Sequence, residues 1–107
     1  MASFGVREFM TLKIERISDK GGTRIRLSGQ FRAERLDQVR AEIERGVPVA
    51  LDLEEVDLVD VEAVRFLNAC RSKGIRMLNC SAYIREWMSR ERRSLDDPRP
   101  HRQEEKE

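Results

Sequence analysis

The chain has 107 residues, of which 39% are apolar and 38% are charged, with 21 Lys and Arg against 20 Asp and Glu. This length suits one domain with a single hydrophobic core and is short for two. The net charge of +1 excludes an electrostatic argument for binding nucleic acid or an anionic membrane.

No apolar run approaches the roughly 20 residues that cross a bilayer, and Met1–Met10 lacks the apolar core of a secretory signal. We therefore expect a cytoplasmic protein without direct membrane insertion. Cys70 and Cys80 lack the spacing of a zinc site and lie far from His101, the only histidine. We expect two buried reduced thiols, no bound metal and no cofactor.

The first predicted element is a β-hairpin over residues 11–29. Apolar and polar residues alternate on both sides of Ser18–Gly22, a turn-like segment with two glycines. The alternating inward positions are Leu12, Ile14, Thr23, Ile25 and Leu27.

A helical period follows from Ala33. Leu36, Val39 and Ile43 fall on one face, and Gly46 is a helix stop. The mostly apolar segment 47–53 then predicts a central strand with Pro48 at its entry.

A second helix is predicted over residues 61–73, closed by Gly74, and a fourth strand over 75–78. A third helix begins near Ser81, a good N-cap residue. It directs Ile84, Trp87 and Met88 to one side, and we expect Tyr83 and Trp87 to pack on the sheet.

The element order β-β-α-β-α-β-α predicts an α/β fold. We expect a single domain with a mixed four-stranded sheet, neighbouring parallel strands and helices mainly on one face. Residues 1–9 are interpreted as an N-terminal extension and 10–91 as the domain. Residues 92–107 carry one large apolar residue, Leu95, and are predicted to form a charged, disordered tail.

The loop expected after the third strand holds the candidate functional residues. Asp60 stands at an N-cap position, and Glu62 adds a charge in the first helical turn. A helical wheel turns Ala63, Phe66, Leu67 and Cys70 toward the core and places Val61 on the other side, near Arg65. A well-capped helix without further function is the alternative interpretation of these carboxylates.

Four segments together resemble a STAS domain, the fold of anti-sigma factor antagonists. They are residues 25–31, 49–56, Val59–Asp60 opening a helix, and 77–81. The similarity covers residues 10–88 and departs at the end, where the family has a further strand and helix.

The resemblance implies a partner-binding site at the start of the second helix, comprising Asp60, Val61, Glu62, Ala63 and Arg65. Phosphorylatable relatives open this helix with Asp-Ser-Ser-Gly, and a partner kinase modifies the first serine. Because Val61 has no hydroxyl group at that position, the usual switch is not expected. Whether Glu62 imitates a phosphorylated state stays open.

These expectations describe a non-catalytic protein-interaction module whose partner is an anti-sigma factor or a kinase-like regulator. We expect no catalytic residue, because the predicted domain contains no histidine to activate a serine. The alternatives are an accessory subunit of a membrane transport complex and a domain that binds a small ligand. The strand 75–78, left as a sheet edge, would either pair with another chain, giving a homodimer, or be covered by residues 1–9.

Overall fold

A computed structural model describes residues 3–9 and 11–96. Five strands form one sheet in the order β1-β2-β3-β4-β5. The strands are β1 Ser3–Phe9, β2 Leu12–Asp19, β3 Gly22–Phe31, β4 Ala50–Val59 and β5 Arg76–Leu78. The helices are α1 Leu36–Glu44, preceded by the 3-10 turn η1 Ala33–Arg35, then α2 Val61–Ser72 and α3 Ala82–Asp96.

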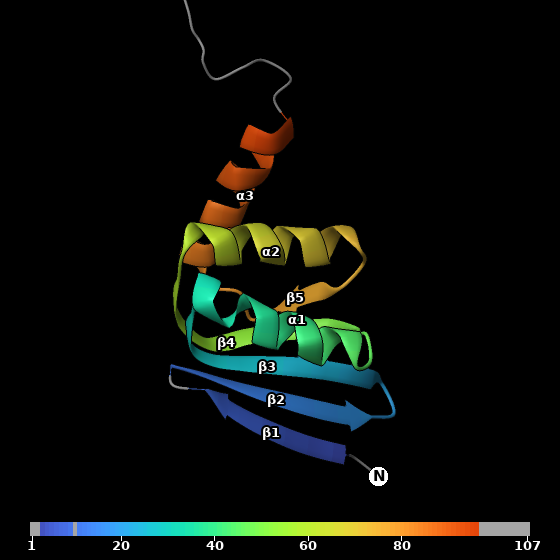
Figure 1. Cartoon of the computed structure of the whole chain (residues 1–107). Coiled ribbons are helices and arrows are strands. Elements are labelled where there is room, and N and C mark those ends of the chain that lie inside the picture. The colour runs from blue at the N-terminus through green and yellow to red at the C-terminus, as the bar shows by residue number, and fades with distance from the viewer. Residues whose placement is uncertain (1–2, 10, 97–107) are drawn as a thin grey trace, which may run out of the picture.

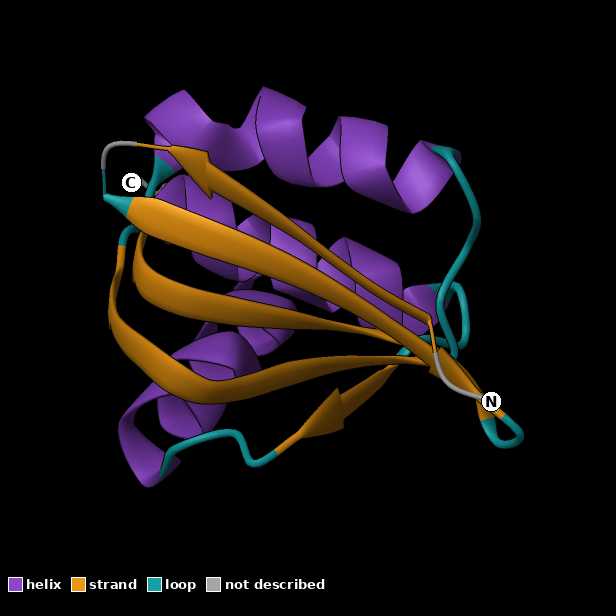
Figure 2. Cartoon of the chain, turned by 90° about the horizontal axis from the view of Figure 1, so that it is seen from below, coloured by secondary structure: helices purple, strands orange, loops and turns teal. Residues whose placement is uncertain are grey.

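The sheet is mixed, and its helices lie on one face. β1, β2 and β3 pair antiparallel, whereas β3, β4 and β5 pair parallel. α1 and α2 form the crossover connections and cover one side of the sheet (Figures 1 and 2). The expected α/β class, the hairpin and the parallel neighbours are confirmed.

The expected number of four strands is wrong, because residues 3–9 are not an extension outside the sheet. They form β1 and pair with β2 from Ser3 opposite Ser18 to Phe9 opposite Leu12. This pairing satisfies the backbone groups on the outer side of β2, which a four-stranded sheet would leave as an edge. β1 and β5 lie at opposite edges, so residues 3–9 do not cover the outer edge of β5.

β4 also differs from the prediction, since it begins at Ala50 and continues through Val59. Residues 54–59, expected in a loop, continue the strand, and four of them pair with β3 across two register shifts, each of which inserts one extra residue in β4. Val47 and Val49, expected in the strand, precede it and are exposed. β4 therefore delivers the chain directly to the start of α2.

The core lies between the sheet and the helices. Val39 of α1 and Leu67 of α2 are fully buried against inward side chains of the strands. The buried strand residues are Leu12, Ile14, Ile25, Leu27, Phe31, Leu51, Leu53, Val56 and Val59. Gly29 is required where β3 passes the start of β2, because its φ is +104° and a Cβ atom would lie 2.4 Å from the carbonyl oxygen of Thr11.

α3 packs on α2 and continues to Asp96, five residues into the segment expected to be a tail. Residues 97–107, the rest of that segment, lie outside the described residues. Ser81 caps α3 as predicted, since its hydroxyl oxygen accepts a hydrogen bond from the Ile84 amide at 3.2 Å. Ile84 and Met88 are buried and Trp87 packs against the core, but Tyr83 is 53% exposed and does not pack on the sheet as expected.

Candidate functional site

Asp60 fixes the start of α2 with both carboxylate oxygens. One oxygen accepts a hydrogen bond from the Ala63 amide at 3.0 Å, as expected for an N-cap. The other accepts from the Ala33 amide at 2.9 Å, at the first residue of η1. The carboxylate thus joins the end of β4, the start of α2 and the segment that leads into α1. The second of these bonds was not predicted.

The five residues assigned to the partner site do not all reach the surface. Asp60 and Val61 are half-buried, and Glu62 and Arg65 are exposed. Ala63 is fully buried in the core, so its assignment to a contact surface is wrong. Ala63 lies in the first turn of α2, on the side of the helix that packs against the core, so its methyl group faces the sheet.

Arg65 lies between two carboxylates. Its guanidinium group is 3.4 Å from Glu62, one turn earlier on α2, and 3.1 Å from Glu91 of α3. Such exposed pairs contribute about 0–1 kcal/mol to stability. They nevertheless offset part of the negative charge at the start of α2 and connect this surface to α3.

An aromatic pair continues the surface along α3. The rings of Tyr83 and Trp87 are one helical turn apart, with centroids separated by 5.9 Å. With Arg90 and Glu91 they line a shallow hollow. We call the combined region the α2–α3 surface and define it as Val61, Glu62, Arg65, Tyr83, Trp87, Arg90 and Glu91.

α2 is buried on two sides, one against the sheet and one against α3, and the helical wheel predicted only the first. Ala63, Leu67 and Cys70 face the core as predicted, and Phe66 is half-buried, with its ring edge-on to Phe31. Val64 and Asn68 are also buried, because α3 packs on a second side of α2. The Asn68 side-chain amide donates a hydrogen bond to the carbonyl oxygen of Met88 at 2.9 Å.

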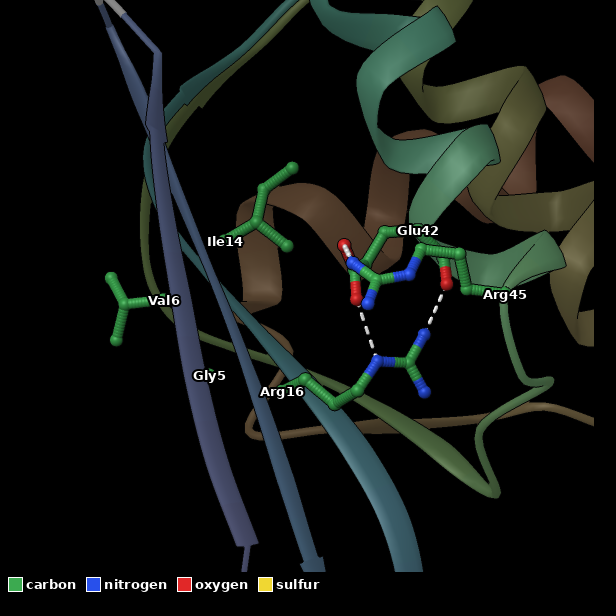
Figure 3. Close-up of a pocket in the computed structure, with 6 residues that line it drawn as sticks. All are labelled: Gly5, Val6, Ile14, Arg16, Glu42 and Arg45. Carbon is green, nitrogen blue, oxygen red and sulfur yellow. Dashed lines mark hydrogen bonds and ion pairs between the residues drawn. The ribbon is translucent and has the colours of Figure 1, made fainter.

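A buried ion pair between β2 and α1 was missed from the sequence. Glu42 is 4% exposed, and its carboxylate lies 2.6 Å from Nε of Arg16 and 3.5 Å from Arg45. Arg16 also donates to the carbonyl oxygens of Glu42 and Gly46, the latter at 3.0 Å, where α1 ends. Figure 3 shows Arg16 reaching toward Glu42 beside Ile14.

This ion pair lines a cavity of about 280 Å³ but has a structural explanation. Arg16 binds backbone carbonyl oxygens that the end of a helix leaves without partners, and it neutralises Glu42 at the same time. The sequence carried a signal for this ion pair, since Arg16 lies two residues after Ile14 and continues the alternating inward positions of Leu12 and Ile14. We assign this cluster to holding α1 on the sheet.

The two thiols differ in burial. Cys70 is buried as expected, whereas Cys80 is only partly buried, and both are free. Burial raises the pKa of Cys70 to about 11 and also raises the pKa of Cys80, against the opposing effect of the nearby Arg85 and Arg71 charges. Neither thiol is activated as a nucleophile by this environment.

No protein-family model matches the chain, and no curated protein matches it. Within residues 3–9 and 11–96, no three His, Cys, Asp or Glu side chains are grouped to hold a metal ion. The helices of this described part include none with the length and apolar character needed to span a membrane.

Proposed function

We propose that the protein is a non-catalytic interaction module that resembles an anti-sigma factor antagonist. It binds a regulatory protein, an anti-sigma factor or a kinase-like regulator, through the α2–α3 surface. The element order implied by the STAS resemblance supports the proposal, since β2 through α3 follow it after the additional strand β1.

The observation that carries the proposal is the fixed start of α2 beside an aromatic pair, formed by the exposed Tyr83 and the half-buried Trp87. Asp60 bonds two backbone amides on different elements, so Val61 and Glu62 are presented in a defined position. A preorganised surface loses less conformational entropy on binding than a flexible loop does.

The composition of the surface also supports protein binding. Tyr, Trp and Arg are the residue types that most often dominate the binding energy of protein interfaces, and Tyr83, Trp87 and Arg90 follow one another along α3. Because Arg65 is paired with both Glu62 and Glu91, a partner can cover Val61 without burying an unpaired charge at that point.

The proposed module is not switched by phosphorylation at the usual position. Val61 occupies that position and offers no hydroxyl group. Glu62 carries a permanent charge, but its carboxylate is engaged by Arg65, so it is a poor imitation of a dianionic phosphate.

A pair of matched valine variants tests the proposal. Val61→Asp places a charge in the α2–α3 surface, and Val47→Asp makes the same change at an exposed site before β4, at the other end of that strand. Immobilised wild type and both variants are exposed to native lysate, and retained proteins are identified by mass spectrometry. We expect one regulatory protein to bind wild type and Val47→Asp but to be lost with Val61→Asp.

Calorimetric titration of that protein then measures the effect. We expect Val61→Asp and Trp87→Ala each to weaken binding by about tenfold or more while circular dichroism shows a folded chain. ATP should leave residues 60–63 unmodified in the complex. Retention of the same proteins by wild type and folded Val61→Asp would show that this surface is not the binding site.

A further inference from the structure

A second hollow lies on the other flank of α3 from the aromatic pair. It is enclosed by the end of α2, by β5 with the turn after it, and by one face of α3, and its volume is about 370 Å³. This is within the range of small-molecule pockets, about 300–1,000 Å³. The lining residues are Arg71, Met77, Asn79, Cys80, Arg85, Met88, Ser89 and Arg92.

Three arginines border this hollow. Arg71 comes from the last turn of α2, and Arg85 and Arg92 lie seven residues apart on α3, two helical turns along the same face. Among the described residues, no ion pair or hydrogen bond engages any of the three guanidinium groups, whereas Arg65 has two carboxylate partners.

The position of Arg85 is electrostatically unfavourable as long as no anion is bound nearby. It lies in the first turn of α3, near the positive end of the helix dipole, and this turn contains no acidic residue. Arg71, in the last turn of its helix, has a structural explanation through the same dipole. Arg85 has no such explanation. A bound anion would compensate both the positive end of the α3 dipole and the repulsion between the arginines.

The wall of the hollow is well fixed and its floor is apolar. Asn79 has a left-handed φ of 55°, and its side chain donates a hydrogen bond at 3.1 Å to the buried carboxylate of Asp52. Asparagine adopts this conformation more readily than most residues, and the hydrogen bond to Asp52 holds it in place. Met77 is half-buried and provides a polarizable apolar surface below the basic rim, with the buried Met88 behind it.

We propose that this pocket binds a small organic anion composed of a phosphate group and a compact apolar body. Arginine binds phosphate oxygens with paired N–H donors. A phosphate dianion can accept hydrogen bonds from several guanidinium groups, whereas a carboxylate has fewer oxygens to accept them. The apolar body lies against Met77. This ligand site is separate from the α2–α3 surface and does not depend on the proposed protein partner.

Titration of the full chain with phenyl phosphate, inorganic phosphate and benzoate at low ionic strength tests both halves of the proposal. In amide-resolved NMR spectra we expect phenyl phosphate to shift signals of Asn79, Cys80 and Arg85. We expect it to bind about tenfold or more tightly than either inorganic phosphate, which lacks the apolar body, or benzoate, which lacks the phosphate.

Two arginine variants on α3 localise the binding. Arg85→Gln should weaken phenyl phosphate binding about tenfold, because it removes one cation from the rim. Arg93→Gln, on the same helix but outside the lining, should leave it unchanged. Both positions are exposed, so both variants should fold, and circular dichroism checks this.

Three results of these titrations would overturn the proposal. They are no saturable binding of phenyl phosphate up to about 10 mM, equal affinity for benzoate, and equal weakening by Arg85→Gln and Arg93→Gln. Vesicles that contain phosphatidic acid distinguish a soluble ligand from a lipid headgroup. We expect no co-sedimentation, and binding to these vesicles without binding of phenyl phosphate would also contradict the proposal.

Discussion

The two ends of α2 differ in the charges that they carry and in how those charges are compensated. At its start, Asp60 bonds two backbone amides, and Arg65 is paired with Glu62 and Glu91. At its end, Arg71 has no acidic partner among the described residues and faces Arg85 and Arg92 across a hollow. A chain with a net charge of +1 can therefore present paired charges at one end of a helix and a basic pocket at the other, which its overall composition conceals.

The largest expected effect concerns the end of α2 and depends on pH. Burial raises the pKa of Cys70 to about 11, from an ordinary value of 9.0. Between these values the unfolded chain releases the thiol proton and the folded chain retains it, so stability is lost as the pH rises. The shift corresponds to about 2–3 kcal/mol of unfolding free energy.

Urea unfolding of wild type and Cys70→Ala at pH 8 to 11 measures this contribution. Other groups titrate in the same range, and the variant subtracts their effect. We expect the unfolding free energy of wild type to fall more steeply with pH than that of Cys70→Ala. Parallel profiles would mean that the Cys70 thiol is solvated in the native protein.

The next effect concerns the start of α2, where Asp60→Ala removes both accepted hydrogen bonds. An N-cap bond contributes about 1 kcal/mol and a further bond a similar amount, so we expect a loss of about 2 kcal/mol. Asp60→Asn keeps one side-chain acceptor and should lose about half of this. Asp57→Ala, at an exposed position of β4, is the control and should change stability little. Equal effects of Asp60→Ala and Asp60→Asn would contradict the two-bond arrangement.

The start of α2 could be predicted from sequence because its determinants are local. An N-cap aspartate, a helical period and a closing glycine lie within a few residues, and the structure confirms Asp60, the helix and its end near Gly74. The same holds for the hairpin of β2 and β3 and for the Ser81 cap of α3.

The missed features depend on contacts between distant segments. The two register shifts in β4 place Leu53, Val56 and Val59 inside at intervals of three, so the period of two that marks a strand is lost. β1 is explained by the free edge of β2 and not by its own weak pattern. Val64 and Asn68 are buried by α3, and the three arginines of the pocket meet only because α2, β5 and α3 converge.

The smallest expected effect is a change in the reactivity of Cys80, which reports the electrostatic field at the basic end of α2. Burial raises the pKa of Cys80, and the charges of Arg85 and Arg71 oppose this shift. Arg85→Gln should therefore raise this pKa further and reduce the thiolate fraction, which is the species that reacts with iodoacetamide. At pH 8 we expect alkylation of Cys80 to slow by about twofold to threefold. Arg93→Gln provides the control for a lost charge on the same helix, and Cys70 should react far more slowly in every variant because it is buried. A rate for Cys80 that Arg85→Gln leaves unchanged would mean that this guanidinium group is directed into solvent, away from the pocket. The two ends of α2 would then differ in where their arginines lie, but a bound anion would not experience a more positive field at the end of the helix.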